Sequence, residues 1–157
     1  MGIEIERKFL TVSDGYRKNY QKKTYYKQGY ITAEKTKTVR IRIAGEHAFI
    51  TIKGATNHCS RIEYEYPIPV KDADEMLEKL CDKPLIEKYR YEYVYNGLKW
   101  EIDEFLGENE GLILAEIELE TEDQPFDKPD FIGKEVTGDI RYYNAHLTYY
   151  PYSEWRK

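Results

Sequence analysis

Charged and apolar residues alternate along most of this chain, and this alternation restricts its fold more than any other feature. A period of two is the spacing at which successive side chains of a β-strand point to opposite faces. The turn sequences Ala44-Gly45-Glu46 and Asn96-Gly97 separate neighbouring runs and indicate hairpins. The alternation predicts strands near 2–10, 24–32, 37–44, 47–54, 60–69, 86–96, 98–106 and 112–120.

Two segments show features of helices instead. In 71–81 the apolar residues Ala73, Met76, Leu77 and Leu80 recur at helical spacing, and Asp72 is placed to cap the N-terminus. A second short helix is expected over 139–149, ended by Pro151, whereas two prolines interrupt 125–135. Eight antiparallel strands with few helices predict a mainly β (α+β) fold in which the sheet closes into a barrel, because closure removes exposed edges.

The bulk composition fits one domain spanning 1–157. The net charge of -5 argues against a nucleic-acid-binding surface, and no apolar run approaches the ~20 residues that a membrane span needs. The N-terminus lacks the features of a signal peptide, and Cys59 and Cys81 show no metal or redox spacing. We therefore expect a cytoplasmic protein with two reduced thiols. The histidines, His47, His58 and His146, lack zinc-site spacing and are expected at the surface or in loops.

The 16 tyrosines fall mostly in the strand-like runs. Aromatic side chains favour strands, so we interpret the tyrosines as strand residues rather than as a platform for nucleobase stacking.

Charges of one sign gather on single strand faces. Arg40 and Arg42 share a face, and so do Glu116 and Glu118. In one strand, such alternation normally means solvent on one side and core on the other, and it does not say which face points inward. Repeated like charges repel unless a counter-ion lies between them. Carboxylate pairs suit a divalent cation, and Arg and Lys pairs suit phosphate, so together these faces predict a site for a metal-bound polyphosphate.

A series of sequence blocks follows in order along the chain: E-I-E-R-K-F-L, V-R-I-R, T-I-K-G, R-I-E-Y-E-Y, K-Y-R, E-I-D-E-F and A-E-I-E-L-E. In these blocks the sequence resembles the CYTH superfamily, the triphosphate tunnel metalloenzymes. The resemblance covers nearly the whole chain. It implies an eight-stranded antiparallel barrel whose lumen is a charged tunnel, with the apolar faces outward beneath a few helices and loops.

The resemblance also implies roles for individual residues. The metal ligands would be Glu4, Glu6, Glu116 and Glu118. Secondary acidic residues that bind metal or orient the attacking water would be Glu63, Glu65 and Asp103. The triphosphate would be held by Lys8, Arg40, Arg42, Lys53, Arg61, Lys88 and Arg90, of which Lys8, Lys53 and Lys88 would also act in catalysis. Three further acidic residues fall on the same strand faces as these predicted site residues but lie outside the firm part of the match. We expect them to be exposed: Glu92, Glu101 and Glu120.

The activity implied is hydrolysis of a triphosphate, most readily inorganic tripolyphosphate to pyrophosphate and orthophosphate, with Mg²⁺ or Mn²⁺ as cofactor. The partner would be this small-molecule substrate. Three alternatives stay open: an adenylyl cyclase of the class IV type, a nucleoside or thiamine triphosphatase, and a non-catalytic polyphosphate-binding module. The sequence leaves the oligomeric state open.

Overall fold

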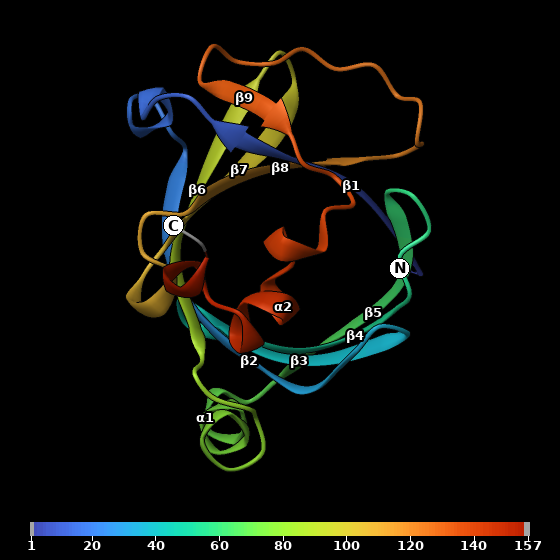
Figure 1. Ribbon diagram of the computed structural model, residues 1–157, viewed down its shortest axis with the longest axis vertical. Coiled ribbons are helices and arrows are strands. Elements are labelled where there is room, and N and C mark those ends of the chain that lie inside the picture. The colour runs from blue at the N-terminus through green and yellow to red at the C-terminus, as the bar shows by residue number, and fades with distance from the viewer. Residues whose placement is uncertain (1, 156–157) are drawn as a thin grey trace.

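The computed structural model describes residues 2–155, and its sheet closes on itself (Figure 1). The strand order is β5-β4-β3-β2-β6-β7-β8-β1, and β5 pairs with β1 to complete the barrel. A short ninth strand pairs with the second half of β1. The strands are β1 (Ile3–Thr11), β2 (Lys22–Glu34), β3 (Lys37–Ala44), β4 (His47–Gly54), β5 (Ser60–Ile68), β6 (Ile86–Tyr95), β7 (Leu98–Phe105), β8 (Ile113–Leu119) and β9 (Ile132–Glu135).

All eight predicted strands are present, and the predicted antiparallel barrel is confirmed. Both predicted hairpin turns are present too, with Gly45, Asn96 and Gly97 at positive φ. The ninth strand was not predicted, because its four residues, I-G-K-E, are too few to show alternation. Gly133 permits its close approach to β1, since a Cβ there would meet Val12 Cγ1 at 2.8 Å.

The predicted first helix is α1 (Val70–Lys79), which packs outside β2, β3 and β4 (Figure 1). Ala73 and Leu77 are buried against the barrel as expected. The expected cap is wrong: Pro69 occupies the N-cap, and Asp72 lies in the first turn, where a negative charge complements the helix dipole. Leu80 is also not part of the buried face, because the helix ends before it and its side chain is 58% exposed.

The predicted second helix is divided in two. The 3-10 helix η3 (Ile140–Tyr142) and the helix α2 (Asn144–Tyr149) are separated by Tyr143, whose backbone is extended. The helix α2 ends before Pro151, as expected. Leu147 of α2 is buried against residues of β6, β7 and β8, so this C-terminal segment covers one end of the barrel, as Figure 1 shows within the ring of strands. Shorter 3-10 helices lie at η1 (Gly15–Arg17), η2 (Gly107–Asn109) and η4 (Tyr152–Glu154).

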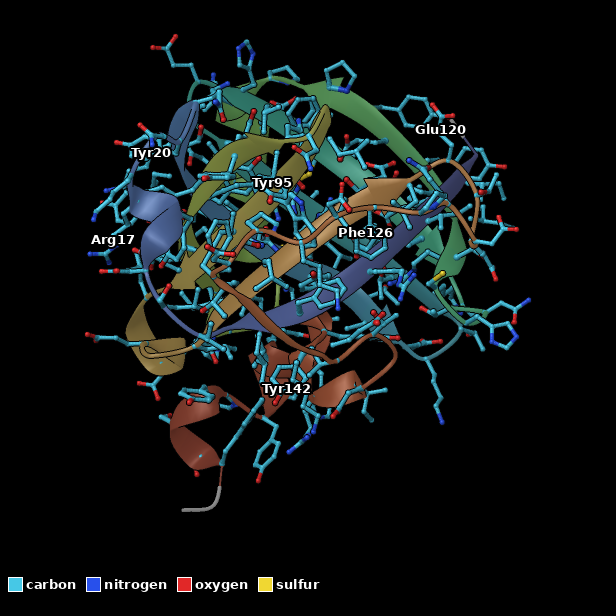
Figure 2. All side chains as sticks on the ribbon, turned by 90° about the horizontal axis from the view of Figure 1, so that it is seen from above. Arg17, Tyr20, Tyr95, Glu120, Phe126 and Tyr142 are labelled. Atoms are coloured by element: carbon cyan, nitrogen blue, oxygen red, sulfur yellow. The ribbon has the colours of Figure 1, made fainter. Side chains whose placement is uncertain are left out.

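The apolar side of the sheet faces outward, and other segments cover much of it. Outside β1, β7 and β8, Phe126 of the loop before β9 packs edge-on against Phe9 and Trp100 (Figure 2). The charged side of the sheet consequently lines the lumen, which confirms the tunnel architecture predicted from the resemblance. Both cysteines are free thiols. Within residues 2–155, no helix is both long and apolar enough to cross a membrane.

Candidate active site in the barrel lumen

The lumen contains a cavity of about 560 Å³ to which all eight barrel strands contribute side chains. Because residues i and i+2 of a strand share a face, the alternating charged residues of neighbouring strands meet inside the barrel. Of the predicted site residues, the structure brings thirteen to the cavity wall: Glu4, Glu6, Lys8, Arg40, Arg42, Lys53, Arg61, Glu63, Glu65, Lys88, Arg90, Glu116 and Glu118.

The strand register places like charges directly opposite one another. Glu6 lies across from Glu118 between β1 and β8, and Glu101 lies across from Glu116 between β7 and β8. Like charges directly opposite in antiparallel strands destabilise the sheet. A cation bound between such pairs would relieve this repulsion.

Two lysines neutralise part of this acidic wall. Lys53 Nζ donates to Glu4 Oε1 at 2.9 Å, and Lys8 Nζ donates to Glu116 Oε2 at 2.6 Å. The carboxylate of Glu6 lies 4.0 Å from Lys8 Nζ. Burial, reinforced by the charges of Glu116 and Glu4, raises the pKa of Glu6 to about 8. The wall thus has fewer cations than its carboxylates require.

The same imbalance appears at Glu118, a more exposed residue at the cavity wall. Partial burial and the charges of Glu4 and Glu63 raise the pKa of its carboxyl group. Within residues 2–155, no three His, Cys, Asp or Glu side chains form a ready-made metal cage. Nevertheless, carboxylate oxygens short of positive charge are the donors that a hard divalent cation prefers when substrate oxygens complete its coordination. The four predicted ligands, Glu4, Glu6, Glu116 and Glu118, fit such an ion.

Three cations surround the ring of Tyr26 on another part of the wall. The guanidinium carbons of Arg42 and Arg90 each lie 4.8 Å from the ring centroid, and Lys88 Nζ lies 5.7 Å from it. Burial lowers the pKa of Lys88 to about 7; Arg90 and Arg42 add to this effect and Asp103 opposes it. Burial and two neighbouring guanidinium groups lower the pKa of Arg42 to about 10. Lys88 and Arg90 pair with Asp103, whereas Arg42 forms no ion pair among the described residues, so an anion could supply its counter-charge.

Arg40 lies beside this cluster with part of its guanidinium unused. Its Nη2 donates to Thr51 Oγ1 at 3.1 Å and to Glu65 Oε2 at 3.4 Å. Its Nε is buried and has no hydrogen-bond partner among the residues that the structure describes. Buried donors in proteins are almost always paired, so a missing acceptor here points to a ligand.

Asp103 lies behind the wall rather than on it. Its side chain is about 2% exposed. Its two oxygens accept from Arg90 Nε at 2.7 Å and Arg90 Nη2 at 2.8 Å, and Lys88 Nζ lies 2.8 Å from Oδ2. Since both oxygens are engaged, this geometry suits an anchor for two cations better than the metal ligand expected from the sequence.

Two of the acidic residues expected at the surface belong to the lumen. Glu92 and Glu101 line the cavity, and Arg90 Nη1 donates to Glu101 Oε1 at 3.2 Å, so their expected exposure is wrong. Glu120 is exposed at the rim of the barrel, as expected (Figure 2). His146 on α2 is half-buried at the cavity wall, whereas the sequence suggested a surface position.

Several cavity residues carry no signal in the sequence. Tyr143, Asn144 and Tyr149 come from the C-terminal segment, and they reach the cavity only because α2 covers the end of the barrel. Tyr26 and Tyr30 also line the cavity, and they lie on a face of β2 that has no charged residue within the predicted strand 24–32.

Comparison with known proteins agrees with this architecture. A family model described as the CYTH domain matches residues 2–145. The chain belongs to this family. A protein named inorganic triphosphatase from Acetivibrio thermocellus is 52% identical over 157 residues, which are 100% of both chains. Another of that name, from Nitrosomonas europaea, is 38% identical over 150 residues, covering 92% of this chain and 95% of the relative.

Solved structures of CYTH proteins show the same fold. The crystal structure of an inorganic triphosphatase superimposes with a TM-score of 0.65 at 34% identity, covering 92% of this chain and 93% of that one. The family membership inferred from the sequence blocks is confirmed.

Proposed function

We propose that this CYTH protein hydrolyses a phosphoanhydride bond of a triphosphate, with inorganic tripolyphosphate as the preferred substrate and pyrophosphate and orthophosphate as products. The observation that carries the proposal is one lumen that holds both a cluster of carboxylates, including Glu6 with its raised pKa, and three cations around Tyr26. The names of the relatives from A. thermocellus and N. europaea support it.

The cations would bind and align the polyphosphate. Arg40 offers a buried Nε without a partner, and Arg42 and Arg90 face the cavity beside it. Guanidinium groups make bidentate contacts with phosphate oxygens, and Lys88 adds a point charge. Lys53 and Arg61 extend the basic surface along β4 and β5. Phosphoryl transfer needs alignment and charge neutralisation more than covalent help, and this set supplies both.

The carboxylate wall would hold the divalent cation. Glu4, Glu6, Glu116 and Glu118 are the residues that fit Mg²⁺ or Mn²⁺. When bound, such an ion neutralises phosphate charge and lowers the pKa of a coordinated water. Lys8 and Lys53, now paired with Glu116 and Glu4, are placed to transfer their hydrogen bonds to phosphate oxygens.

Two further carboxylates would orient the attacking water. Glu63 lies 3.6 Å from Lys53, and Glu65 accepts from Thr51 Oγ1 at 2.7 Å. Both line the cavity, and neither is enclosed by cations as Asp103 is. A carboxylate that keeps a free oxygen can accept a hydrogen bond from water.

Tripolyphosphate is favoured over a nucleoside triphosphate by what surrounds the aromatic residues. The ring of Tyr26 is already approached by Arg42, Arg90 and Lys88, so a nucleobase would have to compete with these cations for it. The charged groups that we assign would bind phosphate or metal, orient water or, in the case of Asp103, anchor two of the cations, and none is assigned to a base or a sugar.

The test is phosphate release from equal concentrations of tripolyphosphate, pyrophosphate, ATP and thiamine triphosphate, with Mg²⁺, with Mn²⁺ and with EDTA. We expect the highest kcat/KM for tripolyphosphate and no release in EDTA. A higher kcat/KM for ATP or thiamine triphosphate would refute the proposed preference. Formation of cyclic AMP from ATP would indicate a cyclase, and tight binding of tripolyphosphate without release would indicate a binding module.

A further inference from the structure

Asn144, the first residue of α2, joins the C-terminal segment to the basic part of the lumen. Its Oδ1 accepts from Lys88 Nζ at 2.7 Å and from Gln28 Nε2 at 3.1 Å. Both donors are almost fully buried, with Lys88 1% and Gln28 0% exposed. Asn144 itself lines the cavity.

Which atoms of Gln28 and Asn144 donate and which accept follows from the chemistry of their partners. Arg42 can only donate, so the oxygen of Gln28 must face it, and the Nε–Oε1 distance is 3.0 Å. The amide nitrogen of Gln28 is thereby turned toward Asn144 and requires an oxygen there. Lys88 also can only donate, and it requires the same oxygen. One orientation of Asn144 satisfies both donors.

This arrangement leaves a defined set of donors for a ligand. The ammonium of Lys88 has three N–H groups. Its Nζ donates to Asn144 and lies 2.8 Å from Asp103 Oδ2, and because Lys88 also lines the cavity, an N–H group can turn toward a ligand there. Among the described residues, Arg42 uses only its Nε, toward Gln28, so the two outer nitrogens of its guanidinium stay available.

A neutral acceptor suits this position better than a carboxylate would. It orients Lys88 and, through Gln28, Arg42 without neutralising either cation. An aspartate at the same place would form an ion pair with Lys88 and would repel an incoming phosphate.

We propose that Asn144 is a positioning residue that fixes Lys88 and Arg42 in the orientation required for binding polyphosphate. The inference rests on the proposed function only in that it assigns the anion as a polyphosphate. Asn144 lies outside every sequence block that resembles the family, and its role depends on where α2 packs.

The experiment measures the dissociation constant of tripolyphosphate by calorimetry, in EDTA at low ionic strength, for wild type, N144A, N144D and K88A, and for the double variant K88A/N144A. The matched control is T148V on the same helix, because Thr148 is buried and its Oγ1 has no partner among the described residues. Thermal melting of each unliganded protein reports any structural damage separately.

We expect N144A to weaken binding by roughly tenfold, as the loss of a hydrogen bond to a charged group does. N144D should bind more weakly than N144A although it can keep both hydrogen bonds, whereas T148V should stay within about twofold of wild type. In the K88A background N144A should have a much smaller effect, because its main partner is gone.

Three results would overturn the proposal: N144A binding like wild type, N144D restoring wild-type affinity, or N144A weakening K88A as much as it weakens wild type. A wild-type protein that binds tripolyphosphate in EDTA but releases no phosphate when Mg²⁺ or Mn²⁺ is added would refute the proposed hydrolysis, and the dissociation constants would still decide the role of Asn144. A wild-type protein that does not bind tripolyphosphate in EDTA would overturn the role proposed for Asn144, and one that also fails to cleave it with Mg²⁺ or Mn²⁺ would overturn both proposals.

Discussion

Replacing Asp103 with asparagine should separate an anchoring role from metal binding. The carboxylate is buried and meets Arg90 at 2.7 and 2.8 Å and Lys88 at 2.8 Å. D103N keeps the shape but removes the carboxylate that pairs with Lys88 and makes the shortest contacts with Arg90, which keeps its longer contacts with Glu101 at 3.2 Å and Glu116 at 3.6 Å. Removing one partner of a buried ion pair costs about 3–5 kcal/mol, a large part of the 5–15 kcal/mol that stabilises a typical domain.

The matched variant is E118Q. Glu118 also faces the lumen, but it is exposed, and the charges of Glu4 and Glu63 raise the pKa of its carboxyl group. Neutralising Glu118 removes its repulsion with Glu4 and Glu63 and leaves no buried cation without its carboxylate partner. In EDTA, E118Q should therefore melt at or above the wild-type temperature, whereas D103N should melt about 10 °C lower, since 1 kcal/mol corresponds to about 2–4 °C at this chain length.

The assay is thermal melting in EDTA, followed by titration of Mg²⁺ and Mn²⁺ during tripolyphosphate hydrolysis. E118Q should raise the metal concentration needed for half-maximal activity. D103N should lower activity at every metal concentration without such a shift. The reasoning fails if D103N melts like wild type, or if its metal requirement changes as that of E118Q does.

Three further perturbations address metal, anion and pH. E6Q should reduce turnover by about 100-fold or more, comparable to losing one electrostatic catalytic group, and EDTA should abolish phosphate release; normal turnover of E6Q would contradict the assignment of Glu6 to the metal. R40A should reduce the rise in melting temperature that tripolyphosphate with Mg²⁺ causes, while the unliganded variant melts at or above wild type; an undiminished rise would exclude Arg40 from the anion site. Hydrogen bonds from Arg7 lower the pKa of Glu135 below its ordinary value of 4.5, so this pair stabilises the fold above that pH and the contribution disappears as pH falls through the folded pKa. E135Q should therefore be less stable than wild type at pH 7 in urea unfolding, and the gap should shrink as pH falls through the folded pKa of Glu135, whereas a constant gap would show that the pair contributes nothing through its charge.

Alternation predicted the strands and which side chains share a face, because both follow from the local geometry of a β-strand. It could not say which face is inside. In most sheets the apolar face is enclosed, and here the charged face is. The resemblance of the ordered sequence blocks to the CYTH superfamily predicted that the charged face points inward, and the periodicity did not.

Register and long-range packing explain the remaining errors. Asp103 lies on the lumen-facing side of β7 by alternation, but its pairing with Arg90 across β6 and β7 buries it behind the cavity wall. Glu101 lies on the same side of β7, and its register opposite Glu116 brings it to the cavity. Neither pairing is visible in a single strand. Asn144 meets Gln28 across 116 residues of sequence, a contact that only the packing of α2 creates.

The electrostatics of the lumen show how the protein can remain folded without ligand and still bind one. Lys8 and Lys53 hydrogen-bond Glu116 and Glu4, so part of the charge on each side is neutralised internally. Burial, together with the charges of Glu116 and Glu4, still raises the pKa of Glu6 although Lys8 and Lys53 oppose it. A triphosphate alone would take the lysines and leave the carboxylates more exposed to one another, and a divalent cation alone would displace the lysines without giving them an acceptor. When both are supplied, the lysines would pair with the triphosphate and the carboxylates with the cation, so few charges would be left unpaired. For this reason we expect anion and cation to bind cooperatively in this lumen.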